Sequence, residues 1–516
     1  MRGGPVGDNF VTAMPTGLPR RKFLGSAAAV TTLATLGDLD FLSLLPRVSA
    51  AESKLNPRTV RFTPEIEPLV RLLEDTPRER LLEEVGTRIR GGLTYRDLLA
   101  ALFLAGVRNI QPRPVGFKFH AVLVVNSAHL ASQNSPEADR WLPIFWALDQ
   151  FKGSQARDVR EGDWTLGAVD ESAVPSAGRA RAALTTALEQ WDVGATDAAT
   201  AGLVRSAAPQ EVFDLLCRHG ARDFRDLGHK AIYVANSWRT LQSIGWQHAE
   251  PVLRSLTYAI LDHEGGNPAQ RDAEVDRAGR HNAEKLNLIP GSWLEGKADA
   301  DGTKVLLRAL RDGSWENGSG TVIELLHRGV ATTSLWAAIF SGAGELLMRR
   351  PGIATLHAVT TTNALHYAFQ HARHDETRRF LLLQAAAFIP QFRAIAGVNA
   401  QQGIRIDDFE PAAAPTMGGV EEIFADLSRD KLLAARKTLA WLGTSGDATR
   451  FITAAQRMIY LKGTDSHDYK FSSAALEDYR HLSPPVRDRF LAASVFWLKG
   501  AGAPDSALVA RTRAAL

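Results

Sequence analysis

Histidine is the residue type whose setting in this sequence is best suited to chemistry. Four of the fourteen histidines lie in helical-looking stretches on four separate segments, at His120, His229, His357 and His467. A neutral imidazole in apolar surroundings costs free energy unless both ring nitrogens find partners. Imidazole also binds iron, zinc and copper, and the helices of a bundle can direct such side chains to one point. The four residues therefore predict a metal site, and a hydrogen-bonded core histidine stays the alternative for each one alone.

Helix geometry restricts which histidines can face a shared site. His129 follows His120 by nine residues, which is 900° along a regular helix, so the two point in opposite directions. His366 likewise follows His357 by nine residues, so these two side chains also point in opposite directions on a regular helix. By contrast, His467 and Lys470 are three residues apart and share a face if a helix has begun there.

Other arrangements of metal-binding or catalytic residues are incomplete. Glu324 and His327 form a single Glu-x-x-His, whereas a ferritin-like di-iron site needs two copies and two further glutamates. His248 and Glu250 have the His-x-acid spacing of a facial triad, but their helical surroundings are unlike the β-barrels that usually carry it. Zincin, P-loop, G-x-S-x-G and dinucleotide-binding motifs are absent. No catalytic residue and no organic-cofactor-binding residue is therefore assigned.

The elements that position these residues are predicted to be helices. Apolar residues at spacings of three and four dominate, and strand-like alternation is scarce. Stretches rich in Gly, Asp and Pro at 153–175 and 286–320 predict long loops that border a pocket. We expect an all-α fold, with a single large multi-helix domain over residues 51–516 and long irregular loops. Helical patterns include residues 119–132, 137–152, 225–243, 321–349, 352–372 and 471–481.

Composition excludes several classes of protein. The net charge of the 516 residues is only +3, so no strong electrostatic attraction to nucleic acid is expected. Cys217 is the only cysteine, which excludes an intramolecular disulfide and a thiolate cluster. We expect it to be a small core residue. Beyond the first 50 residues no uncharged apolar stretch is long enough to span a bilayer, so no stable membrane span is expected.

The first 50 residues have the pattern of a twin-arginine export signal. Arg20 and Arg21 precede Phe-Leu, a short apolar run follows, and an A-x-A-like end closes the segment. Asp38 and Asp40 break the apolar run too soon for a membrane-spanning helix. We therefore expect the twin-arginine (Tat) machinery to export the chain in folded form, so that it is periplasmic or secreted. A basic N-terminal arm beside a chance apolar stretch is the other interpretation.

The order of the histidine segments resembles the questin oxidase-like family of helical oxygenases. The motifs that carry the resemblance are an early histidine helix before Trp141–Trp146, Gly228-His229, His357-x-x-Thr360 and Asp465-x-His467-x-x-Lys470. It spans roughly residues 115–475. The resemblance implies an all-α fold and a mononuclear non-haem iron centre. It also implies dioxygen-dependent cleavage of an aromatic polyketide such as an anthraquinone.

The same resemblance implies a ligand set. Carried over by position, the metal ligands are His120, His229, His357 and His467, and Lys470 is an auxiliary ligand. An ammonium group cannot bind a cation, so Lys470 would have to lose its proton or capture carbon dioxide as a carbamate. Pairing of this lysine with Asp465 or Asp468 is an equally acceptable interpretation. Asp465, Thr361 and Tyr233 are expected to orient the imidazoles through their free nitrogens.

Three functions are compatible with these features. The first is an exported non-haem iron oxygenase that acts on an aromatic or polycyclic small molecule with dioxygen. The second is a hydrolase that uses zinc to activate water. The third is a non-catalytic helical protein of the cell envelope. The export signal and the 286–320 insertion depart from the family pattern, and an exported relative can keep the metal site while using another substrate.

Overall fold

The computed structural model describes residues 58–399, 403–412, 418–445 and 447–516. The predicted export signal lies outside these residues. The described part of the chain belongs to one compact unit, Asn56–Leu516. The regular structure of the described residues is helical, and among them extended pairing is limited to two isolated bridges, Thr59 with Gly167 and Lys297 with Val330. The predicted all-α fold is therefore confirmed.

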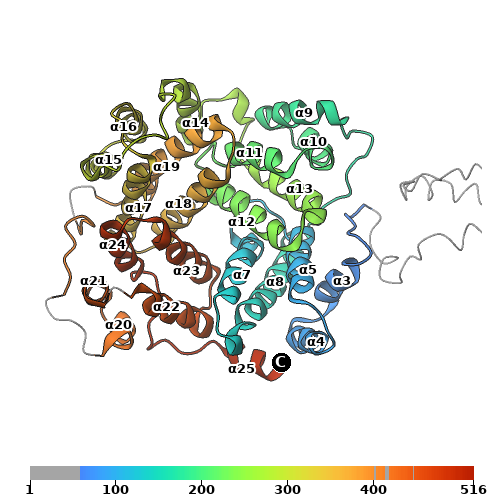
Figure 1. Cartoon of the computed structure of the whole chain (residues 1–516). Helices are drawn as coiled ribbons and strands as arrows, with labels where there is room; N and C mark the ends of the chain where they lie inside the picture. The colour runs from blue at the N-terminus through green and yellow to red at the C-terminus, as the bar shows by residue number, and fades with distance from the viewer. Residues whose placement is uncertain (1–57, 400–402, 413–417, 446) are drawn as a thin grey trace, which may run out of the picture. The chain divides into compact units, whose positions relative to one another are not determined.

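The helices follow the chain in three groups, where α marks α-helices and η marks 3₁₀ helices (Figure 1). The first group comprises α3 (Glu67–Asp75), α4 (Arg78–Arg90), α5 (Tyr95–Asn109), η3 (Phe117–Phe119), α6 (His120–Leu123), α7 (Val125–Gln133), η4 (Glu137–Asp139) and α8 (Leu142–Glu161). The second comprises α9 (Ala177–Gln190), α10 (Val193–Ser206), α11 (Pro209–Gly220), η5 (Arg225–Gly228), α12 (His229–Ile244), η6 (Trp246–His248), α13 (Ala249–Ile260), η7 (Pro268–Gln270), α14 (Glu274–Lys285) and η8 (Leu286–Leu288). The third comprises α15 (Ala300–Asp312), α16 (Trp315–His327), α17 (Thr332–Arg349), α18 (Ile353–His371), α19 (Asp375–Ala396), α20 (Gly419–Leu427), α21 (Lys431–Ser445), α22 (Ala448–Lys462), α23 (Ser466–Asp478), η9 (Tyr479–His481), α24 (Pro484–Ser494) and α25 (Ala507–Ala515).

The stretch 286–320 is more helical than the sequence predicts, because its polar residues serve as helix caps. The Asp299 carboxylate accepts hydrogen bonds from the backbone N–H groups of Asp301 and Gly302 and begins α15. Ser314 forms a capping box that begins α16. The prediction that this stretch borders a pocket is met in part, since residues 298–307 border a cavity of about 460 Å³.

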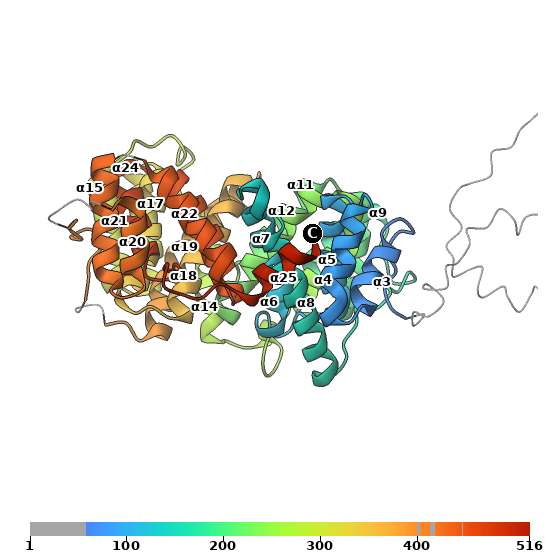
Figure 2. The same cartoon turned by 90° about the horizontal axis from the view of Figure 1, so that it is seen from below.

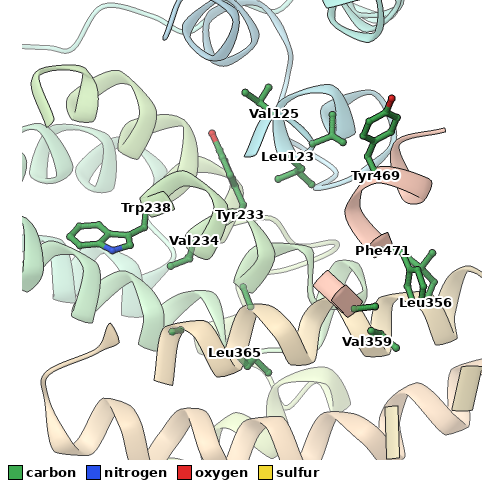
Figure 3. Packing of buried hydrophobic residues seen from close by; sticks show 14 of the residues in the cluster. Leu123, Val125, Tyr233, Val234, Trp238, Leu356, Val359, Leu365, Tyr469 and Phe471 are labelled. Atoms are coloured by element: carbon green, nitrogen blue, oxygen red, sulfur yellow. The ribbon is translucent and has the colours of Figure 1, made fainter. Parts of the chain in front are cut away.

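Helix α12 lies at the centre of the bundle and packs against α7 and α18, while α23 packs against α7 and α18 (Figure 1). Figure 3 shows the apolar side chains that these helices and α6 bury between them. The labelled residues are Leu123, Val125, Tyr233, Val234, Trp238, Leu356, Val359, Leu365, Tyr469 and Phe471, all of which are buried. Burial of a side chain of this size contributes roughly 1.5–3 kcal/mol. This core therefore fixes the relative positions of the four helices that bear the predicted histidines.

The last helix, α25, returns to the start of the unit and packs on α4 (Figure 2). A glycine makes this contact possible, because a Cβ atom on Gly86 would overlap the carbonyl group of Ala515. The Arg511 guanidinium adds an ion pair, with Nε 2.9 Å from Glu83 Oε1. Among the described helices, none combines the length and apolar character needed to cross a bilayer.

Candidate metal centre

Three of the four predicted histidines meet at one point. His120 begins α6, His229 begins α12 and His357 lies in the first turns of α18. The Nε2 atom of His229 is 3.0 Å from Nε2 of His120 and 2.8 Å from Nε2 of His357. One ligand atom from each residue lies within 4.8 Å of the others. Nitrogens that each stand about 2 Å from a common ion would be this close together.

The opposite nitrogen of each ring is held by a backbone carbonyl. His120 Nδ1 is 2.9 Å from the carbonyl oxygen of Phe117, and His357 Nδ1 is 2.7 Å from that of Ile353. His229 Nδ1 makes the same kind of contact with the carbonyl of Asp226. Since a carbonyl only accepts, each Nδ1 carries the proton and donates it. Each Nε2 atom is therefore unprotonated and carries a lone pair. The three lone pairs lie close together in the cluster.

His467 supplies a fourth imidazole to the same cluster. Its ring centroid lies 4.6 Å from that of His120 and 5.2 Å from that of His357. The Nδ1 atom is 2.6 Å from Asp465 Oδ1, and the Nε2 atom is buried without a hydrogen-bond partner. The bond to His467 lowers the pKa of Asp465 to about 2. A carboxylate that orients the free nitrogen of an imidazole is the arrangement found behind many metal-binding histidines.

Lys470 lies one helical turn after His467, and its Nζ atom is 3.4 Å from His357 Nε2. The side chain is buried, and burial lowers the pKa of its amine to about 7. Asp468, one of its predicted partners, instead contacts Lys499 at 2.9 Å. The carboxylate of Asp468 also accepts hydrogen bonds from the backbone of residues 464 and 465. Lys470 therefore belongs to the cluster, with its amine next to the imidazole of His357.

Burial governs the charge state of the imidazoles. It lowers the pKa of His120, His229 and His357 well below the usual value, and the positive charge of Lys470 lowers it further. The rings are consequently neutral near pH 7, which is the state in which imidazole binds a metal ion.

A strained loop places His229. Asp226 and Leu227 in η5 both have a φ of 53°, a left-handed conformation that non-glycine residues rarely adopt. This conformation turns the Asp226 carbonyl toward His229. Gly228 follows with a φ of 78°, and a Cβ atom there would lie 2.5 Å from Thr361 Cγ2. Strain of this kind persists only where the surrounding packing enforces it, and it concentrates at functional sites.

The predicted orienting residues divide into one that contacts an imidazole and two that do not. Asp465 contacts His467, as described above. The Thr361 hydroxyl instead donates to the carbonyl of Leu227 at 3.2 Å. The Tyr233 hydroxyl donates to Ser255 Oγ at 3.1 Å. The prediction for Thr361 and Tyr233 is therefore wrong, because backbone carbonyls already occupy the Nδ1 positions that these hydroxyls were expected to reach.

No family model, curated protein or solved structure matches the chain.

The remaining histidines singled out by the sequence lie in other contacts. His129 is hydrogen-bonded to Tyr95 and Ser243, at 3.0 and 3.1 Å. The ring of His366 packs against Trp336, with 4.7 Å between the centroids. Both face away from the cluster, as the nine-residue spacing predicts. Cys217 is buried in the core, which confirms its predicted place.

The cluster has an open side and a closed side. His120 and His467 are half-buried, and the side chain of Asp465 is 62% exposed, so solvent reaches this side. On the other side, Lys470 borders a small polar cavity of about 10 Å³, roughly the space needed by one water molecule. Two buried oxygens without a partner belong to residues of its lining, Asn126 Oδ1 and Thr360 Oγ1. The sequence did not reveal this cavity, because its residues come from four different helices.

Proposed function

We propose that this protein is a non-haem metalloenzyme, an iron-dependent oxygenase that acts on an aromatic or polycyclic small molecule with dioxygen. One observation carries the metal centre, namely that Nε2 of His229 lies 3.0 Å from Nε2 of His120 and 2.8 Å from Nε2 of His357, while the Nδ1 of each ring faces a backbone carbonyl. Lone pairs so close together repel one another unless a cation lies among them. The ring of His467 lies beside this triad, 4.6 Å from that of His120 between centroids, and its buried Nε2 has no partner, but only the other three histidines place their ligand atoms within 4.8 Å of one another.

The donor set fits a first-row transition metal. Imidazole nitrogens suit iron, zinc and copper, and calcium or magnesium would require oxygen ligands. His120, His229, His357 and His467 would hold the ion, and a bound iron would supply the redox chemistry with dioxygen. The preference for iron rests on the sequence resemblance to questin oxidase-like oxygenases.

Lys470 would complete this set as a carbamate. A neutral amine attacks carbon dioxide with its lone pair, a C–N bond forms, and one N–H proton leaves to solvent. The product is an anionic oxygen donor on a side chain that already lies 3.4 Å from His357 Nε2. Burial supports this step, since it leaves a large share of the amine unprotonated near pH 7.

The protein's own groups would then perform three tasks. Backbone carbonyls hold the imidazoles in one tautomer, and Asp465 does the same for His467. The apolar core on α12 and α18 limits the space for water on the closed side to a cavity of about 10 Å³. The half-buried side at His120 and His467 would leave these two imidazoles accessible from solvent.

Metal analysis of purified protein tests the proposal. We expect about one equivalent of a transition metal in the parent protein and its loss in His229→Ala and His357→Ala. His371→Ala is the matched control, because His371 is an exposed residue at the end of the same helix as His357. Stoichiometric metal in both site variants would remove these residues from the site.

A zinc hydrolase is the second candidate, because three imidazoles with an accessible further position also describe catalytic zinc sites. The identity of the bound metal and the uptake of dioxygen distinguish the two. An oxygenase consumes oxygen when a suitable aromatic substrate is supplied, and a hydrolase consumes none with any substrate.

We also propose export by the twin-arginine pathway, on the strength of the N-terminal sequence alone. Replacing Arg20 and Arg21 by lysines should keep the protein in the cytoplasmic fraction. Unchanged delivery to the periplasm or medium would contradict this route.

A further inference from the structure

Outside the metal centre, a cavity of about 460 Å³ opens between α15, α17 and α24. Helices α15 and α24 both pack on α17 (Figure 2). On each helix the bordering residues lie at spacings of three, four or seven, which share one helix face. They are Ala300, Thr303, Lys304 and Leu307 on α15, Ser334, Ala337 and Ser341 on α17, and Val486 and Arg489 on α24. On α15 and α17 most of these side chains are Ala, Ser or Thr, so the facing helices leave a space of the size that small-molecule sites usually have.

A buried ion-pair network fixes a further wall of this cavity, at Ile406 and Asp407. The Glu345 carboxylate on α17 accepts a hydrogen bond from the backbone N–H of Ile406 at 3.0 Å. Its two oxygens also accept from two guanidinium nitrogens of Arg311 on α15, both at 2.8 Å. The same guanidinium contacts the Asp407 carboxylate. Such two-point contacts are among the strongest polar interactions in proteins, so the cavity is already formed before a ligand binds and little ordering is needed.

Three hydroxyl groups of residues that border the cavity already have partners in the protein. The Ser334 hydroxyl accepts a hydrogen bond from the backbone N–H of Asp299 at 2.9 Å. The Thr303 hydroxyl donates to the carbonyl of Ser334 at 3.0 Å. The Ser341 hydroxyl donates to the carbonyl of Ala337 at 2.8 Å. A wall whose polar groups are satisfied in this way offers a ligand mainly van der Waals contact.

The charged side chains that border the cavity balance one another. They comprise two acids, Asp299 and Asp407, and two bases, Lys304 and Arg489. Asp299 caps α15, Asp407 belongs to the network described above, and Lys304 is exposed. His481 also borders the cavity, and burial lowers the pKa of its imidazole, so it is neutral near pH 7. Since these charges sum to zero, the lining as a whole favours neither an anion nor a cation.

We propose that this cavity binds a neutral, mainly apolar small molecule. The ligand would lie against Leu307, Ile406 and Val486, the large apolar residues of the lining. A charged ligand would lose its hydration without gaining a net opposite charge, which costs free energy. None of the four imidazoles of the candidate metal centre borders the cavity, so this site does not depend on the proposed metal.

Calorimetric titration of the full chain with 2-naphthol at pH 7 tests the proposal. The anion 2-naphthoate and the cation 2-naphthylmethylammonium carry the same ring system with opposite charges. We expect saturable binding of 2-naphthol at one site and at least tenfold weaker binding of both ions. Equal or tighter binding of 2-naphthoate would mean that Arg489 selects an anion, and equal or tighter binding of the cation would mean that the acids select it. Either result would overturn the proposal.

Two variants on different helices locate the binding, so that the test survives if one of them fails to fold. Thr333 and Ala300 are exposed residues that border the cavity, so Thr333→Trp and Ala300→Trp should block it and abolish 2-naphthol binding while circular dichroism stays unchanged. Thr332→Trp is the matched control, since Thr332 precedes Thr333 on α17 but does not border the cavity, and it should bind as the parent does.

No saturable binding of 2-naphthol in the parent, or binding of parental strength in the folded Thr333→Trp and Ala300→Trp proteins, would overturn the proposal. Metal content should be the same in all of these proteins, so failure of this site and failure of the metal centre are distinguishable.

Discussion

At the scale of single residues, Lys470 contrasts with Lys230, another buried lysine. Lys230 is balanced by Asp223, whose Oδ2 is 3.1 Å away, and by the carbonyl of Asp262 at 2.7 Å. By contrast, the Nζ atom of Lys470 contacts an imidazole nitrogen, Nε2 of His357, at 3.4 Å. Another base cannot compensate the cost of burying the amine and the Asp465 carboxylate offsets only part of it, so Lys470 destabilises the protein when no metal is bound.

We therefore predict that Lys470→Met stabilises the metal-free protein at pH 7 by about 1–3 kcal/mol in urea unfolding. Lys230→Met should do the opposite and cost about 3 kcal/mol, because it removes one partner of a buried ion pair.

The sign of the pH dependence of this stability follows from the lowered pKa of Lys470. Between about 7 in the folded state and 10.5 in the unfolded state, the unfolded chain binds the extra proton. The parent's stability thus rises with pH and its deficit against Lys470→Met shrinks toward pH 10. A Lys470→Met protein that is less stable than the parent at pH 7 would contradict this account.

At the scale of elements, the short helix η5 decides whether His229 can point into the cluster. Gly228→Ala would force a left-handed φ on alanine and press its Cβ atom against Thr361. We expect a loss of about 2–4 kcal/mol in unfolding free energy, together with weaker metal retention. Gly92→Ala is the matched control, since it has a φ of 98° but open space around it, and it should cost about 1 kcal/mol without affecting the metal. Equal effects of the two substitutions on metal content would show that the η5 geometry does not position His229.

The elements also show what the sequence can and cannot reveal. Periodicity located the histidine helices, and the phase argument separated His129 and His366 from the cluster. The left-handed conformations of Asp226 and Leu227 were not foreseeable, because nothing in these residue types requires them. The carbonyls that bind the Nδ1 atoms were missed for a similar reason, since every residue carries a carbonyl and only the fold selects which one is used. The sequence predicts a loop around Asp299, whereas this residue begins a helix, because the same residue types favour loops and helix starts.

At the scale of the whole molecule, the candidate centre joins segments that are far apart in the chain. His120 and His357 are separated by 237 positions, yet both lie within hydrogen-bonding distance of His229 Nε2. An unfolded chain cannot hold these ligands together, so an ion that binds the centre binds the folded state alone. Its binding free energy then adds directly to the stability of the compact unit.

This linkage gives a quantitative prediction. Adding the metal to chelator-treated protein should raise the unfolding free energy with the logarithm of the free metal concentration. The gain should reach about 2.7 kcal/mol at one hundred times the dissociation constant. The His357→Ala protein should show little of this rise, whereas His371→Ala should follow the parent. A rise of parental size in His357→Ala would mean that the stabilising ion binds elsewhere. If no first-row divalent ion raised the unfolding free energy of the parent protein, the proposal of a metal centre at the three Nε2 atoms would be contradicted.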